Sequence, residues 1–360
     1  MKSFSNLFSS LAKKSRSSNG VVGIDIGSSS IKVVELQESE GILSLSTYGE
    51  LQLGPYADKE VGQSVTLSSE KEQQALVDII RESAVKASNA VFAMPLSSSF
   101  VTIINFSAEP DEDISSRIRV EARKYIPVPI GEVTLDWAEI DSTTDDKNKV
   151  QRDVLVAAIQ NEALNRFKIL MQFVNLKEPP TEIECFSSIR GAYREKEKNV
   201  AIIDIGAVST KLYISKDGLL QRMHRVRAGG AIATKRIAGA LEQSFEEAEV
   251  TKRSVTKDDE KFSEIQHAHH SCYERAWEEF RMFIREYEEI TATPLDAVYL
   301  TGGGSIFPTT KSFLESTLQK DISSVSTFDK VAYPAFMEDM VTELGPTFHV
   351  ALGAALRVYE

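Results

Sequence analysis

The pattern Asp-Ile-Gly-x-x-Ser-x-Lys occurs twice in this chain, at residues 25–32 and again at residues 204–211. Each copy follows a run of β-branched apolar residues and leads into a second run of strand character, so each predicts a β-hairpin with small residues in its turn. Such a turn exposes backbone N–H groups beside a carboxylate. Two copies far apart in the chain predict two related half-domains that face each other. A phosphate chain would fit between them, with the two carboxylates holding a divalent cation.

A third glycine-rich segment, Gly302-Gly303-Gly304, follows the apolar run at residues 298–300. Glycine lets the backbone approach a flat ligand closely, because no side chain intervenes. A tight turn between a strand and a helix would need glycine as well, but the two companion turns favour the ligand interpretation. The chain contains no GxxxxGK[ST] pattern, which excludes a P-loop site at the level of motifs.

The composition restricts the classes of partner and compartment. A net charge of −12 over 360 residues disfavours nucleic acid, which binds basic surfaces. The two cysteines, Cys185 and Cys272, are far apart and form no disulfide framework, which is compatible with the reducing cytosol. The sequence shows neither an apolar run of membrane-span length nor the apolar core of a signal peptide, so we expect a cytoplasmic protein.

The order of the expected strands and helices divides the chain into two lobes, of which the first is interrupted. Pro179 and Pro180 mark a joint before a new element. A single long charged helix is expected over residues 258–290. The expected segments are a basic tail at 1–20, a first lobe at 21–97 and 173–199, an inserted small domain at 98–172 and a second lobe at 200–360.

Two further segments have alternative interpretations. Residues 1–20 are rich in serine and basic residues, with Phe4, Leu7, Phe8 and Leu11 at helical spacing. They would form either a short amphipathic helix on an anionic membrane or a frayed tail. Residues 267–270, His-Ala-His-His, place two imidazoles on one helical face, but no convincing companion ligand follows. We therefore predict a solvated helix face there rather than a metal site.

The ordered set of motifs resembles the actin-like nucleotide-binding superfamily, and most closely the PilM family of type IV pilus assembly proteins. The Asp-Ile-Gly turns are shared with the whole superfamily, whereas the segment Tyr125-Ile126-Pro127-Val128-Pro129 is specific to the family. The resemblance implies an α/β, actin-like, two-lobed ATP-binding fold with an inserted small α+β domain of the FtsA-like type. It covers nearly the whole chain after residue 20 and rests on residues 23–36, 121–133, 202–210, 245–252, 302–304 and 352–357.

The resemblance also implies a site for ATP and Mg²⁺ between the lobes. Asp25 and Asp204 would face the metal, and Asp204 would also serve catalysis. Glu184 would position the attacking water, unless it is a surface or capping acid. Because Ala207 and Val208 replace the glycine-rich second turn of relatives, we expect weak transition-state stabilisation and slow or partner-dependent hydrolysis. The implied nucleotide contacts are Gly27, Ser28, Ser29 and Lys32 in the first turn, Gly206, Ala207 and Ser209 in the second, Gly229 and Gly230 before a helix, Glu249 and Lys252 near the ribose and base, and Gly303 and Gly304 on the adenine.

The function implied is binding and assembly. In the family, the N-terminal cytoplasmic peptide of a PilN-type inner-membrane protein docks beside the inserted domain, which would bring the protein and other platform components together at the inner-membrane face. Self-association into a homo-oligomer is compatible with this interpretation. Ile126, Val128 and Ile130 would form a rigid apolar edge for the peptide, or would bury against their own domain.

Two alternative functions follow from the same superfamily. The first is an FtsA-like division protein, which carries a C-terminal amphipathic tether. The last quoted motif here is followed only by Val358-Tyr359-Glu360, so we expect no such tether. The second is a small-molecule kinase, which would need a substrate base that the sequence does not offer.

Overall fold

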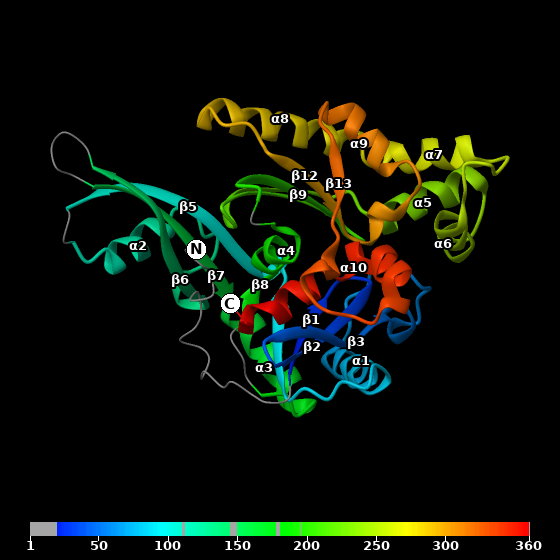
Figure 1. Ribbon diagram of the computed structural model, residues 1–360, viewed down its shortest axis with the longest axis horizontal. Coiled ribbons are helices and arrows are strands. Elements are labelled where there is room, and N and C mark those ends of the chain that lie inside the picture. The colour runs from blue at the N-terminus through cyan, green and yellow to red at the C-terminus, as the bar shows by residue number, and fades with distance from the viewer. Residues whose placement is uncertain (1–19, 110–111, 145–149, 178–180, 195, 360) are drawn as a thin grey trace.

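Two five-stranded sheets with the same strand order and directions form the centre of the molecule (Figure 1). The computed structural model describes residues 20–109, 112–144, 150–177, 181–194 and 196–359. In each sheet a central strand is antiparallel to one neighbour and parallel to the other. The first sheet has the order β3 (Ile42–Gln52), β2 (Ser30–Ser39), β1 (Val21–Ile26), β4 (Asn89–Met94) and β8 (Glu182–Ile183), and the second has the order β11 (Leu219–Val226), β10 (Thr210–Lys216), β9 (Asn199–Ile205), β12 (Ala297–Thr301) and β13 (Ile322–Ser324).

The two repeated motifs form the same hairpin in the two sheets, as predicted. In the first, Asp25 lies opposite Lys32, and in the second Asp204 lies opposite Lys211. The turns also close alike. The N–H of Gly27 donates to the Ser30 carbonyl at 3.0 Å, and the equivalent bond in the second turn, from Gly206 to Ser209, measures 3.1 Å. The duplication in sequence is therefore a duplication in structure.

Helices α4 (Glu184–Ala192) and α10 (Glu338–Leu356) lie between the two sheets (Figure 1). They cross at glycines, where the backbones touch. A Cβ atom on Gly353 would lie 1.9 Å from the carbonyl oxygen of Ser187, and one on Gly191 would lie 2.2 Å from that of His349. The apolar C-terminal stretch that resembles the family therefore contributes a close contact between α10 and α4.

The outer faces of the two sheets carry separate helical layers. Helices α1 (Ser69–Glu82) and α3 (Asn161–Phe173) cover the first sheet, where Phe92 and Phe167 meet edge to face with ring centroids 5.3 Å apart. Helices α8 (Glu274–Thr291) and α9 (Thr310–Leu318) cover the second sheet, with Trp277 buried. Helices α5 (Gly230–Leu241), α6 (Phe245–Ser254) and α7 (Phe262–Ser271) form a cluster of their own beyond it.

The prediction of one long helix over residues 258–290 was wrong. Helix α7 ends at Ser271 and α8 begins at Glu274, with Cys272 and Tyr273 between them. The two helices bury different faces: α7 packs on the α5–α6 cluster through Ile265, whereas α8 packs on the second sheet. Tertiary packing therefore bends a segment whose composition favours a continuous helix.

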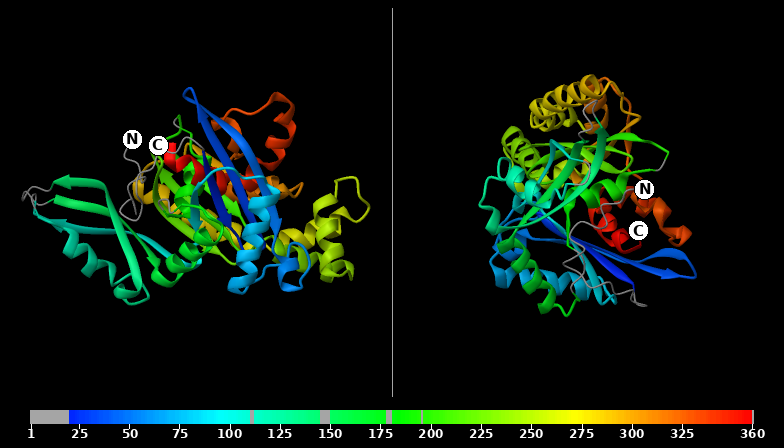
Figure 2. Two further views of the ribbon diagram at one scale, coloured as in Figure 1. Left: turned by 90° about the horizontal axis from the view of Figure 1, so that it is seen from below. Right: turned by 90° about the vertical axis from the view of Figure 1, so that its left-hand side faces the viewer.

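The inserted segment projects away from both lobes (Figure 2). It contains a three-stranded sheet in the order β5 (Ser99–Ala108), β7 (Val150–Gln160) and β6 (Val133–Thr144), with α2 (Ser115–Ala122) on one face. Helix α3, which the sequence prediction included in this domain up to residue 172, packs in an apolar cluster that contains both first-lobe residues and Leu155 and Ala157 of β7. Ile126 is buried beside α2, and Val128 and Ile130 are half-buried against the same core. The exposed apolar edge expected of these residues is therefore absent, and they pack against their own domain.

Two remaining expectations concern membranes. None of the described helices is long and apolar enough to cross a membrane. The predicted amphipathic helix or tail at residues 1–20 lies almost wholly outside the described residues, which begin at Gly20.

Candidate functional site

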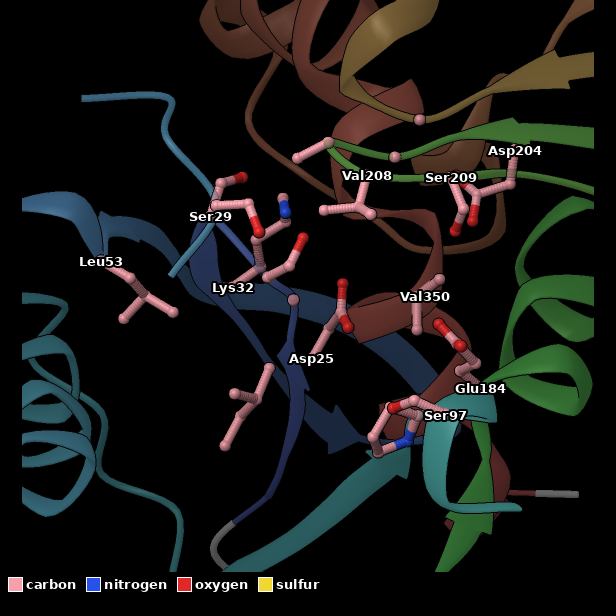
Figure 3. A pocket seen from close by; sticks show the side chains of 18 of the residues that line it. Asp25, Ser29, Lys32, Leu53, Ser97, Glu184, Asp204, Val208, Ser209 and Val350 are labelled. Carbon is pink, nitrogen blue, oxygen red and sulfur yellow. The ribbon is translucent and has the colours of Figure 1, made fainter. Parts of the chain in front are cut away.

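The two repeated turns line one cavity of about 520 Å³ between the lobes (Figure 3). Asp25 and Lys32 point into it from the first lobe, and Asp204 and Ser209 from the second. Gly302 and Gly303 close one side. A cavity of this size suits a small organic ligand. The predicted site residues that line it are Asp25, Gly27, Ser28, Ser29, Lys32, Glu184, Asp204, Gly206, Ala207, Ser209 and Gly303.

In the first turn, the carboxylate of Asp25 lies near cations without contacting one. Burial raises the pKa of Asp25 from 3.8 to about 6, and the nearby positive charge of Lys32 offsets only part of that rise. Lys32 itself donates to the Ser30 hydroxyl at 2.9 Å and lies 3.7 Å from the Glu50 carboxylate. Among the described residues, no side chain forms a hydrogen bond or ion pair with Asp25.

In the second turn, one lysine holds two acids. The ammonium of Lys211 lies 2.7 Å from Glu184 Oε2 and 3.4 Å from Asp204 Oδ2. Burial alone would raise the pKa of Asp204, but the attraction and hydrogen bond of Lys211, together with the charges of His349 and Lys32, hold that pKa below its usual value. Burial likewise disfavours the charged form of Lys211, but attraction to the two acids dominates and raises its pKa well above its ordinary value.

Glu184 stands at the start of α4, where a negative charge interacts favourably with the helix dipole. Its second oxygen, Oε1, accepts a hydrogen bond from the Leu96 N–H at 2.8 Å. Both oxygens of this acid are therefore engaged. His349 of α10 also lines the cavity, its Nε2 lies 3.0 Å from the Ser188 hydroxyl of α4, and burial lowers its pKa.

Five of the predicted contacts lie outside the lining of this cavity. Gly229 and Gly230 pack on the second turn, where the Gly230 N–H donates to the Gly206 carbonyl at 2.9 Å. Gly304 packs against Ile205 of β9. Glu249 and Lys252 lie together on α6, where Lys252 donates to Glu249 at 2.6 Å and to Thr234 at 2.8 Å.

The family model for the type IV pilus assembly protein PilM matches residues 23–359 of this chain. The chain belongs to the PilM family of type IV pilus assembly proteins. That match favours this family over the division-type and kinase alternatives.

Solved structures agree with this placement. A structure described as the PilM–PilN type IV pilus biogenesis complex contains a chain that is 26% identical to this one. The alignment has a TM-score of 0.79 and covers 96% of this chain and 100% of that one. The ethanolamine utilization protein EutJ from Carboxydothermus hydrogenoformans is 15% identical, with a TM-score of 0.54, and 96% and 92% of the two chains are covered. MreB5 of Spiroplasma citri bound to ADP is 12% identical, with a TM-score of 0.53 and coverage of 94% and 95%. The last two show the fold alone, and the predicted actin-like fold is confirmed.

Several polar residues that line the cavity of this PilM-family protein were missed by sequence reasoning, among them Lys211, Arg225 and His349. Lys211 is the last residue of the second motif copy, so its equivalence to Lys32 would have identified it. Arg225 lies opposite Lys211 in β11 and donates to the Ser209 hydroxyl at 3.1 Å. His349 lies on α10, and no local sequence pattern predicts that it lines the cavity.

The predicted solvated face at residues 267–270 is correct for His267, which is exposed, but wrong for His269 and His270. His269 is only 2% exposed and stacks on Phe307, with ring centroids 3.8 Å apart. His270 stacks on Phe313 at 4.1 Å and its Nε2 lies 2.9 Å from the Thr309 hydroxyl. These imidazoles therefore belong to an aromatic core, and no group of three metal-binding side chains occurs in the described part of the chain.

Proposed function

We propose that this protein binds ATP with a divalent cation in the cavity between its lobes and, in that form, docks the N-terminal cytoplasmic peptide of a PilN-type inner-membrane protein during pilus assembly. The observation that carries the nucleotide proposal is the convergence of both Asp-Ile-Gly turns and Gly303 on one cavity. The protein would act in the cytoplasm, at the inner-membrane face, through this partner.

The cavity offers the groups that a nucleoside triphosphate needs. The two turns present backbone and hydroxyl groups to the phosphates, and Lys32 and Arg225 add positive charge from opposite lobes. Gly303 leaves room for a flat base, because the nearest atom to a Cβ placed on it would be Thr347 Oγ1 at 4.0 Å. These features support ATP as the ligand, as does the ADP bound by MreB5, a protein of the same fold.

A Mg²⁺ ion fits the residues present. Mg²⁺ is usually held by one or two carboxylates together with substrate phosphates and water, not by a cage of protein ligands. Asp25 supplies such a carboxylate on the cavity wall, and the described residues contain no group of three ligands that would hold an ion without nucleotide. The ion would neutralise phosphate charge and would therefore bind together with the nucleotide.

Filling the cavity at Gly303 tests the nucleotide site. Gly303→Leu should abolish ATP binding measured by calorimetry, because its side chain would enter the open space without meeting the backbone. Gly239→Leu is the matched control in the same lobe, since Gly239 is exposed on α5 and nothing lies within 4 Å of its Cβ position. Equal affinity in both variants would remove the cavity as the nucleotide site.

The inserted sheet suggests where the peptide docks. The face opposite α2 carries the half-buried apolar residues Val101, Ile103, Ala138 and Ile140. They belong to the same apolar cluster as Met223 of β11, so this strip lies where the insertion meets the lobes. Apolar side chains along exposed strands suit an extended peptide, which gains affinity from main-chain hydrogen bonds and specificity from side-chain pockets. The PilM–PilN complex among the similar structures supports this class of partner.

Introducing a negative charge on each face of the inserted sheet in turn tests the proposed peptide site. Ile103→Asp should abolish binding of a PilN-type N-terminal peptide, measured by fluorescence anisotropy. Val120→Asp is the control, because Val120 is 55% exposed on α2, at the opposite face. If Ile103→Asp folds, binds ATP and still binds the peptide, the strip is not the docking site.

A further inference from the structure

The two Asp-Ile-Gly turns have the same backbone arrangement, but their lysines have different partners. In the first, Lys32 bonds to a serine and to Glu50, and Asp25 remains without a bonded partner in the described part of the chain. In the second, the equivalent lysine, Lys211, turns to the acids of its own cavity. This difference arises from the surroundings, since only the second hairpin faces the start of α4, which supplies Glu184.

The cluster around Lys211 is closed and buried. The side chains of Lys211, Glu184 and Asp204 are 13%, 10% and 7% exposed. Glu184 uses one oxygen for Lys211 and the other for the Leu96 N–H. Asp204 uses Oδ2 for Lys211, while its Oδ1 lies beside Gly302, where a side chain would clash because a Cβ would be 2.4 Å from that oxygen. The ammonium of Lys211 thus already compensates the charge of the acids of the second lobe.

We infer that Lys211 is a built-in cation that holds Asp204 and Glu184 in the place of a metal ion, so that the divalent cation accompanying the nucleotide is bound from the first lobe, through Asp25. This inference rests on the proposed nucleotide site and narrows its metal ligands from two aspartates to one. A metal ion that contacted Asp204 would also lie next to a buried ammonium, and the two positive charges would repel each other. Asp25 has no such neighbour in contact.

The consequence is a nucleotide site that depends little on metal. A divalent ion strengthens ATP binding by the free energy of its own contacts with protein ligands in the complex. Here one carboxylate makes such a contact instead of two. Coupling between two ligands of one protein is typically about 5- to 150-fold. For the native protein we expect the low end of that range, about fivefold, between ATP affinity in Mg²⁺ and in EDTA.

The experiment measures ATP affinity by calorimetry, with Mg²⁺ and with EDTA, in the full chain and its variants. Lys211→Met keeps the length of the side chain and removes the charge, which releases Asp204 as a second ligand. We expect it to raise the Mg²⁺ dependence by about tenfold, equivalent to about 1.4 kcal/mol. Lys216→Met is the matched control, because Lys216 is exposed at the end of the same strand. It should behave as the native protein.

Two aspartate variants provide a second measurement, should Lys211→Met fail to fold. In the Lys211-containing protein, Asp25→Asn should remove the remaining Mg²⁺ dependence of ATP affinity, and Asp204→Asn should preserve it. Electron paramagnetic resonance of Mn²⁺ bound with ATP should likewise differ from the native spectrum in Asp25→Asn and match it in Asp204→Asn. A hundredfold loss of native ATP affinity in EDTA, or an equal effect of the two asparagine variants, would overturn the inference while leaving the nucleotide site in place. No ATP binding in either condition would overturn the proposed function and this inference with it.

Discussion

Gly353 of α10 lies against Ser187 of α4 so closely that a Cβ on the glycine would be 1.9 Å from the serine carbonyl oxygen. Real Cβ atoms do not approach backbone oxygens to that distance, so any side chain at residue 353 forces the two helices apart. Because α4 also begins at Glu184, a shift of this helix would move an acid of the cavity. One glycine therefore connects the packing between the lobes with the geometry of the site.

We expect Gly353→Ala to destabilise the protein, although alanine is the better helix former. Overpacking costs about 1–3 kcal/mol, and here the clash is with backbone, which cannot rotate away. Chemical denaturation followed by circular dichroism measures the loss. Gly239→Ala on α5 is the control, because it meets nothing within 4 Å and should stabilise by about 0.5–1 kcal/mol. Unchanged stability in Gly353→Ala would mean that the helices pack less closely than described.

A second prediction concerns acid sensitivity. Burial lowers the pKa of His269 from 6.5 to about 3, so the folded protein holds this imidazole neutral while the unfolded chain protonates it. The stabilisation is complete above pH 6.5 and is lost as the pH falls towards 3. Between pH 7 and pH 5 we expect a loss of about 2 kcal/mol from this group.

His269→Phe should flatten this pH dependence. Phenylalanine keeps the stack on Phe307 and removes the titrating group, and the Nδ1 atom that it replaces has no hydrogen-bond partner among the described residues. Denaturant midpoints at pH 7 and pH 5 give the comparison. His267→Phe, at an exposed position on the same helix, should keep the native slope. If both variants keep it, His269 does not contribute to acid sensitivity.

Sequence reasoning predicted those parts of the fold that depend on residues close together in the chain. Both hairpins were predictable because each motif copy carries its own strand, turn and strand. The roles of Lys32 and Lys211 were not, because they depend on neighbours that arrive from elsewhere in the chain, and only Lys211 meets Glu184. The bend at Cys272 was missed for the same reason: neither residue 272 nor residue 273 is a helix breaker, and the direction of α8 is set by the sheet that it covers.

A third prediction tests the charge that faces the phosphates. Arg225 lines the cavity and donates to Ser209 of the second turn, and no described acid pairs with it. Arg225→Gln should weaken ATP binding by about 1.5 kcal/mol, roughly tenfold, and leave adenosine binding unchanged. Arg227→Gln serves as the control, since Arg227 is exposed and lies outside the cavity lining. Equal losses for ATP and adenosine would place Arg225 away from the phosphates.

The last prediction is that hydrolysis is slow. Ala207 and Val208 give the second turn fewer freely oriented N–H donors than a glycine-rich turn would have. Glu184, the acid expected to position water, is occupied by Lys211 at one oxygen and by the Leu96 N–H at the other. We expect steady-state phosphate release by the isolated protein below about one per second.

Glu184→Gln separates orientation of the water from proton abstraction. Glutamine retains an oxygen that can accept a hydrogen bond but cannot take a proton at neutral pH. If Glu184 only orients groups in the cavity, the variant should hydrolyse ATP within about tenfold of the native rate, whereas removal of a general base typically costs about 10²–10⁴-fold. ATP affinity measured in parallel establishes that the variant still binds nucleotide. A hundredfold fall in phosphate release at unchanged affinity would assign Glu184 as the base, and it would require Lys211 to move away from it once ATP is bound.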